Sequence, residues 1–138
     1  MKIMIVCSYA FYNQIPNIKI ELEKMGYQVF LPNGYEDPNF IVKTRYEEGF
    51  ADWIANLRKA SEETITKVDA LLVLNYAKNG IDNYIGGSTF LEMHDAYRMN
   101  KQIFIMNDLP EKLLTEEIIG FKPILLKGNL SILKENMQ

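Results

Sequence analysis

The sequence predicts one α/β domain over residues 1–138, with helices on both faces of a five-stranded parallel sheet. Five short apolar runs alternate with segments in which apolar residues recur at helical spacing, and most of the connections are short. One of these runs, 69–75, is apolar between polar ends, which is typical of a central strand buried on both faces. The length of 138 residues, with 48% apolar and 24% charged residues, fits one globular domain with its own core.

Each expected element has its own signals in the sequence. The expected strands are the apolar, partly β-branched runs 3–7, 27–31, 69–75, 101–106 and 122–126. The expected helices carry apolar residues at helical spacing and cover 15–25, 41–67, 88–99, 111–119 and 130–136. Pro16 suits the first turn of the first helix, and Gly26 suits its C-terminal cap. Gly49 is expected to divide or kink the second helix.

This order of elements is that of a flavodoxin-like or Rossmann-like three-layer domain with the strands in the order 2-1-3-4-5. Ligands bind such a sheet at the C-terminal ends of its strands, near the switch point between the first and third strands. Three expected loops meet there, at residues 8–13, 75–87 and 107–110. The sequence therefore predicts the functional site at this edge of the sheet.

Charge and composition exclude several classes of protein. The net charge is −3, and 15 basic residues are scattered among 18 acidic ones, so we expect no nucleic-acid partner. No apolar run approaches about 18 residues, so we expect no membrane partner, and the first apolar run is too short for a signal peptide. The single cysteine, Cys7, fits a reducing cytoplasm, where we expect the protein to act.

The common cofactor and metal motifs are missing from the sequence. After the first strand the chain reads Cys-Ser-Tyr-Ala-Phe-Tyr over 7–12, which has neither the G-x-G-x-x-G of dinucleotide-binding folds nor a P-loop. His94 has no second histidine or cysteine at metal-ligand spacing, so we interpret it as an ordinary helix residue. We therefore expect neither a cofactor nor a metal ion.

A glycine pair followed by a serine, a threonine and a glutamate is the most informative pattern. Gly86 and Gly87 let the backbone come close to a ligand. Ser88 or Thr89 then opens a helix, whose free N–H groups favour an anion such as phosphate. Glu92 follows in the first turn or just after it, toward the mouth of the sheet. A second interpretation stays open, because Thr89-x-x-Glu92 matches a capping box in which both side chains satisfy backbone N–H groups.

The same segment resembles the nucleoside 2-deoxyribosyltransferase superfamily. The run Gly-Ser-Thr-Phe-Leu-Glu-Met-x-x-Ala over 87–96 is similar to the superfamily's pattern, although the turn that follows is Asn-Lys-Gln where Gly-Lys-Pro is usual. Asp69 before the third strand and Ser8-x-x-Phe11 after the first strand are similar as well. The resemblance covers most of the chain in order and implies a flavodoxin-like fold.

The resemblance also implies a reaction. Superfamily members attack C1′ of a deoxynucleoside or deoxynucleotide with a glutamate, which the resemblance places at Glu92. They pass the sugar to another base or, in the related 2′-deoxynucleoside 5′-phosphate N-hydrolases, to water. A carboxylate suits this chemistry because positive charge builds up on the sugar ring when the N-glycosidic bond breaks. A homodimer or larger homo-oligomer is implied as well.

Further roles follow from the resemblance. Asp69 is expected to hold or protonate the leaving base, with a polar residue at a strand end as the alternative. Tyr9 or Phe11 is expected to stack on the base, and the alternative is that one of them covers the sheet edge. Ser88 is expected to bind a phosphate or a sugar hydroxyl, and the alternative is that it is a helix N-cap. The full set of expected substrate contacts is Ser8, Tyr9, Phe11, Asn75, Asn83, Gly86, Gly87, Ser88 and Thr89.

One position departs from the superfamily pattern. In the transferases an aspartate stands six residues before the glutamate, where this chain has Gly86. Asp82 or Asn83 would have to reach in from the loop to replace it. Two functions therefore stay open: an enzyme that breaks an N-glycosidic bond, and a catalytically inactive nucleotide-binding module of the same fold. A structural domain that binds no ligand is a third and weaker hypothesis.

Overall fold

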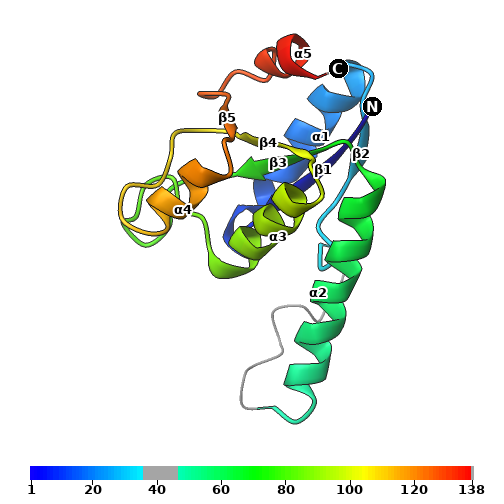
Figure 1. The fold of residues 1–138 in the computed structure, drawn as a ribbon, viewed down its shortest axis with the longest axis vertical. Helices are drawn as coiled ribbons and strands as arrows, with labels where there is room; N and C mark the ends of the chain where they lie inside the picture. Colours follow the sequence, from blue (N-terminus) through cyan, green and yellow to red (C-terminus); the bar gives the residue numbers. More distant parts are fainter. Residues whose placement is uncertain (36–46, 138) are drawn as a thin grey trace.

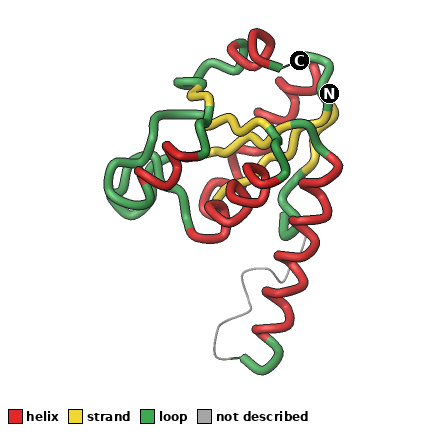
Figure 2. Tube along the Cα trace, viewed as in Figure 1, coloured by secondary structure: helices red, strands yellow, loops and turns green. Residues whose placement is uncertain are grey.

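The computed structural model describes residues 1–35 and 47–137 and contains a five-stranded sheet in which all neighbouring strands run parallel (Figures 1 and 2). The strands are β1 (Lys2–Cys7), β2 (Gln28–Phe30), β3 (Ala70–Leu74), β4 (Gln102–Ile105) and β5 (Ile124–Leu125). Their order across the sheet is β2-β1-β3-β4-β5. The predicted α/β class, the parallel sheet and the strand order are confirmed.

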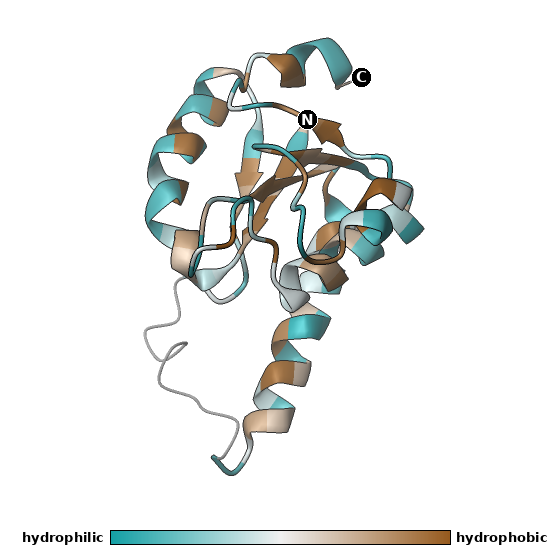
Figure 3. Ribbon diagram, turned by 90° about the vertical axis from the view of Figure 1, so that its left-hand side faces the viewer, coloured by the Kyte–Doolittle hydropathy of each residue, from teal (hydrophilic) through white to brown (hydrophobic). Residues whose placement is uncertain are grey.

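Helices cover both faces of this sheet. In the described part of the chain they are η1 (Tyr9–Gln14, a 3-10 helix), α1 (Ile15–Lys24), α2 (Phe50–Lys67), α3 (Gly87–Arg98), α4 (Thr115–Gly120) and α5 (Ile132–Asn136). Successive side chains of a strand point to opposite faces, so the core has two layers. Ile3 and Ile5 pack with α1 and α5, whereas Met4 and Val6 pack with α2, α3 and α4. Figure 3 shows the hydrophobic strands between the two helical layers.

The strand register brings the ends of three strands to one edge of the sheet. Cys7 at the end of β1 pairs with Leu74 at the end of β3. Val73 of β3 pairs with Ile105 at the end of β4. The segments after β1, β3 and β4 therefore leave the sheet at the same C-terminal edge, where ligands bind in folds of this kind.

Some element boundaries differ from the prediction. The segment 8–13, expected as a loop, forms η1, and Ser8 caps it by accepting a hydrogen bond from the N–H of Ala10 at 3.4 Å. Gly49 has a left-handed φ of 81° and is the N-cap of α2, so this helix begins directly after it. Residues 41–46 of the expected second helix lie outside the described residues. Helix α4 begins at Thr115, later than expected, after a residue in the left-handed region.

Helix α2 extends beyond the sheet. Its C-terminal end packs on the sheet through the fully buried Ile65, whereas its N-terminal half projects away from the rest of the domain (Figure 1). Ile54 and Leu57 in this projecting half are half-buried. Among the helices that the structure describes, none is long and apolar enough to cross a bilayer.

Candidate active site

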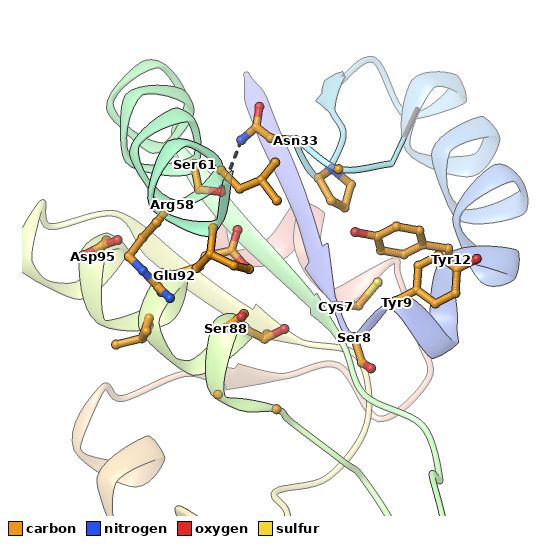
Figure 4. Close-up of a pocket in the computed structure, with 18 of the residues that line it drawn as sticks. Cys7, Ser8, Tyr9, Tyr12, Asn33, Arg58, Ser61, Ser88, Glu92 and Asp95 are labelled. Atoms are coloured by element: carbon orange, nitrogen blue, oxygen red, sulfur yellow. Dashed lines mark hydrogen bonds between the residues drawn. The ribbon is translucent and has the colours of Figure 1, made fainter. Parts of the chain in front are cut away.

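A pocket of about 270 Å³ lies at the C-terminal edge of the sheet (Figure 4). This volume is close to the lower end of the range for small-molecule sites, which is about 300 Å³. Cys7 and Ser8 line the pocket from the end of β1, and Asn33 lines it from the segment after β2. Helix α2 contributes Arg58 among others, and α3 contributes Glu92. The pocket therefore collects side chains from four separate parts of the chain at the predicted edge.

Glu92 lies in the second turn of α3 and is partly exposed within the pocket. Burial raises the pKa of its carboxyl group to about 7, and the charge of Asp95 acts in the same direction. A hydrogen bond with Ser61 and the charge of Arg58 lower the pKa without offsetting burial. At neutral pH the carboxyl group is therefore present in both protonation states, which is typical of a group that attacks a substrate or moves a proton.

The start of α3 differs from the capping-box interpretation. The helix begins at Gly87, and its N-cap is Gly86, which has no side chain with which to cap it. The N–H of Phe90 donates to the C=O of Gly86 at 2.9 Å. Thr89 is therefore inside the first turn, with 3% of its surface exposed, and Glu92 lies one turn further on, in the pocket wall. The capping box is wrong, and so is the alternative of a serine N-cap, because a glycine already occupies that position.

The pocket brings together seven of the predicted site residues. They are Ser8, Tyr9, Gly86, Gly87, Ser88, Thr89 and Glu92. Tyr9 and Tyr12 form an aromatic wall with ring centroids 5.1 Å apart, on the side of the pocket opposite Glu92 (Figure 4). A ligand in this pocket would lie between two aromatic rings and a carboxyl group.

Three predicted substrate contacts lie outside the pocket lining. Phe11 is 4% exposed and packs edge-on against a neighbouring tyrosine in the core. Asn75 is fully buried; its side chain accepts from the N–H of Asn107 at 3.0 Å and donates to the C=O of Asp108 at 2.7 Å. The C=O of Asn83 accepts a further bond from Asn75 at 3.4 Å. These residues hold together the loops that surround the pocket.

Asp69 also lies away from the pocket. It stands immediately before β3, and its carboxylate accepts a hydrogen bond of 2.8 Å from the N–H of Lys2. The five residues of β3, about 16 Å of strand, separate it from the C-terminal edge. The structure does not bring Asp69 to Glu92, so it cannot hold or protonate a base there. Asp69 is therefore a polar residue at the end of a strand, which is the alternative given for it above.

Twelve of the residues that line the pocket were not among the predicted site residues. They include Asn33, Arg58, Ser61 and Asp95. Asp95 follows Glu92 by three residues, a spacing that places both on one face of α3 and was readable in the sequence. Ser61 follows Leu57 by four residues and so extends the apolar stripe of α2 with a hydroxyl group, which is a weaker signal.

In the part of the chain that the structure describes, the other reactive side chains give no second site. Burial, with a smaller effect of Glu92, raises the pKa of the Cys7 thiol to about 12, so this thiol stays neutral and is not a nucleophile. His94 packs near Phe121 with ring centroids 6.2 Å apart. Within residues 1–35 and 47–137, no group of three histidine, cysteine or acidic side chains is placed to hold a metal ion.

Solved structures that are similar to this structure include two enzymes. One is a 2-deoxyribosyltransferase from Bacillus psychrosaccharolyticus, with a TM-score of 0.55 and 18% identity over 76% of this chain and 71% of that chain. The other is the CMP N-glycosidase BcmB of Clostridium botulinum, with a TM-score of 0.56 and 14% identity over 100% of both chains. No protein-family model matches this chain, and no curated protein matches it significantly. The fold is therefore that of a 2-deoxyribosyltransferase and of a CMP N-glycosidase, as the sequence resemblance implies.

Proposed function

We propose that this protein breaks the N-glycosidic bond of a nucleoside or nucleoside 5′-monophosphate, with Glu92 as the nucleophile, and passes the sugar to water or to another base. The observation that carries this proposal is the carboxyl group of Glu92, which lines a pocket at the C-terminal edge of the sheet and has a pKa of about 7. The fold shared with a 2-deoxyribosyltransferase and a CMP N-glycosidase supports the same class of substrate.

In the proposed reaction, ionised Glu92 attacks C1′ of the sugar. The bond from C1′ to the base nitrogen breaks, and its electron pair leaves with the base. The carboxylate stabilises the positive charge that develops on the ring and then forms a glycosyl ester, which water or a second base opens. Tyr9 and Tyr12 offer the base a stacking surface across the pocket, and stacking of this kind contributes about 1–3 kcal/mol.

The leaving base needs a proton, and Asp95 is the second carboxyl group in the pocket lining. Burial, followed by the charge of Glu62, raises the pKa of Asp95 and favours its protonated form. We expect Asp95→Asn to lower kcat about tenfold with little change in KM, because asparagine can still hydrogen-bond to the base but cannot protonate it. Steady-state kinetics measure this effect. A kcat within twofold of wild type would remove Asp95 from the mechanism.

The start of α3 is the proposed site for a 5′-phosphate. Gly86 at the N-cap has no side chain that could satisfy the N–H groups of Gly87, Ser88 and Thr89, and the helix dipole favours an anion there. Lys78 adds a positive charge nearby, since its Nζ donates to the hydroxyl of Ser8 at 3.3 Å. We expect nucleoside 5′-monophosphates to bind about tenfold more tightly than the matching nucleosides, and less so at high salt. Calorimetric titration with matched pairs measures this difference, and equal affinities would remove the phosphate from the proposal.

The second candidate function is a nucleotide-binding module without turnover. Gly86 favours it, because the transferases carry an aspartate at that position, and so does the placement of Asp69 at the far edge of the sheet. One panel separates the two functions. The protein is incubated with deoxynucleosides, deoxynucleoside 5′-monophosphates and ribonucleoside 5′-monophosphates including CMP, and free base is detected by chromatography. Free base supports the enzyme, whereas tight monophosphate binding without free base from any substrate supports the module.

We also propose a homodimer or larger homo-oligomer that acts in the cytoplasm. The part of α2 that projects from the rest of the domain supports an interface between copies of the chain. The single buried thiol supports a reducing compartment.

A further inference from the structure

Lys78 lies outside the pocket lining but contacts two residues that belong to it. Its Nζ donates a hydrogen bond of 3.3 Å to the hydroxyl oxygen of Ser8, which directly follows β1. The same Nζ lies 4.8 Å from the centre of the ring of Tyr84, within the range of a cation–π interaction. Lys78 therefore connects the segment after β3 to the segment after β1 beside the pocket.

The backbone around Lys78 forms a tight turn. The N–H of Lys78 donates to the C=O of Ile81 at 2.9 Å, and the N–H of Ile81 donates back at the same distance. Asn79 and Gly80 between them both have positive φ, as a two-residue hairpin turn requires. The turn fixes the point from which the Lys78 side chain reaches Ser8.

Gly86 leaves the space that the ring of Tyr84 occupies. A Cβ atom at position 86 would lie 3.2 Å from the hydroxyl oxygen of Tyr84 and 3.3 Å from its Cε1, which is tighter than an ordinary van der Waals contact. The backbone itself does not require glycine there, since its φ is −85°. Phe11 packs against the other side of this arrangement, with its ring centroid 6.5 Å from that of Tyr84. The missing side chain at position 86 thus allows Tyr84 to hold the ammonium group of Lys78.

The hydrogen bonds of Ser8 leave its hydroxyl group with a proton to donate. The oxygen lies 3.4 Å from the N–H of Ala10 and 3.3 Å from Nζ of Lys78. A backbone N–H and an ammonium group donate and never accept, so the Ser8 oxygen is the acceptor in both bonds. Among the described residues, none accepts a hydrogen bond from this hydroxyl. Because Ser8 lines the pocket (Figure 4), its proton is available to an acceptor atom of a ligand.

We propose that Lys78 is a positioning residue that makes the hydroxyl of Ser8 a hydrogen-bond donor to an oxygen of the substrate's 5′-phosphate. This inference rests on the proposed function and names residues that would select the nucleotide over the nucleoside. A phosphate oxygen is a strong acceptor and matches a hydroxyl whose lone pairs are already used. The ammonium group of Lys78 polarises this hydroxyl, which strengthens its donation, and its positive charge favours an anion over a neutral group.

The test measures the preference for phosphate, which is the Kd of a nucleoside divided by the Kd of its 5′-monophosphate. The probes are the four common deoxynucleoside 5′-monophosphates, CMP and the matching nucleosides, each titrated by calorimetry. In Lys78→Met and in Ser8→Ala we expect this preference to fall about threefold, as for the loss of one long hydrogen bond. In the double variant we expect about the same threefold loss, because both residues act through one contact, whereas independent residues would give about ninefold.

Lys24→Met is the matched control. Lys24 is exposed at the C-terminal end of α1 and does not line the pocket, so its replacement removes the same charge elsewhere. We expect this variant to keep the wild-type preference for phosphate. A threefold loss in Lys24→Met as well would assign the effect to net charge and overturn the role of Lys78.

Affinity for the nucleosides separates positioning from damage to the fold, and we expect it to stay within about twofold of wild type in every variant. An unchanged preference in Lys78→Met overturns the inference, and so does a ninefold loss in the double variant. If Ser8→Ala does not fold because η1 has lost its cap, Lys78→Met decides by itself, since a change in the turn leaves that cap in place.

Base release is measured separately, so the two proposals can fail separately. If wild type prefers the monophosphates but releases no base, the proposed reaction fails, and the variants still decide the role of Lys78. If wild type releases base but binds nucleosides and monophosphates equally, the proposed reaction stands and this inference is overturned.

Discussion

Glu92→Gln is expected to reduce base release by several orders of magnitude while the chain stays folded. A neutral amide is a poor nucleophile toward C1′ and does not stabilise positive charge on the sugar ring as a carboxylate does. Glutamine has nearly the same shape as glutamate, so the packing of α2 against α3 is retained. Single-turnover release of base, measured by chromatography, gives the rate, and thermal unfolding shows whether the fold persists.

The matched control for this substitution is Glu63→Gln. Glu63 is exposed on α2 and does not line the pocket, so its replacement removes the same charge without changing the site. We expect this variant to release base at the wild-type rate. Base release by Glu92→Gln at the wild-type rate would show that Glu92 is not the nucleophile. If wild type releases no base from any substrate, nucleotide binding without turnover takes the place of the proposed reaction.

The sheet could be predicted from the sequence because its strands are buried on both faces. Every residue of β3 is at most 1% exposed, since α1 and α5 cover one face and α2, α3 and α4 cover the other. A strand in such a place has to be apolar throughout, and this is the pattern of residues 69–75. The strand order then follows from the short connections and the preference for right-handed crossovers.

The start of α3 could be predicted only in part. The glycine pair gave the right place for the pocket, but the N-cap was assigned three residues too late. A glycine N-cap has no side chain and leaves no polar signal, whereas Thr89-x-x-Glu92 has the spacing of a capping box without forming one. The burial of Thr89 decides between the glycine N-cap and the capping box. This burial results from tertiary packing, which cannot be inferred from the spacing of residues alone.

The long-range contacts of the site could not be predicted from spacing. Asn33 and Ser61 are 28 positions apart in the chain and meet because β2 and α2 lie near the same edge. The position of Asp69, in contrast, was predictable from topology. A residue that precedes a parallel strand lies at the N-terminal edge, whereas ligand sites of this fold lie at the C-terminal edge. The sequence resemblance favoured Asp69, and the topology argues against a role for it in the site.

Base release is expected to fall with pH below about 7, because the proposed attack needs ionised Glu92. Its pKa of about 7 means that about half of the molecules carry the carboxylate at pH 7 and about 1% at pH 5, so kcat/KM falls roughly fiftyfold over this range. A deoxynucleoside without phosphate is the appropriate substrate, because a phosphate group itself titrates near pH 6. A profile of kcat/KM that is flat from pH 5 to pH 7 would contradict the assignment of this pKa to the nucleophile.

Protonation of Glu92 would not cause the loss of activity at low pH by unfolding the protein. It has the opposite effect on stability, because the protonated form of Glu92 stabilises the folded state. Its pKa is raised from 4.5 to about 7 in the folded chain, so the folded state binds this proton more tightly than the unfolded state does. The contribution of Glu92 to the free energy of unfolding is therefore fully present below about pH 4.5 and is lost as the pH rises through 7. Glu92→Gln removes this dependence, so we expect the Tm of the variant relative to wild type to increase between pH 5 and pH 8.5. Thermal unfolding of both proteins at the two pH values measures this difference. If the Tm of wild type fell together with the rate of base release between pH 7 and pH 5, the loss of activity would be due to unfolding.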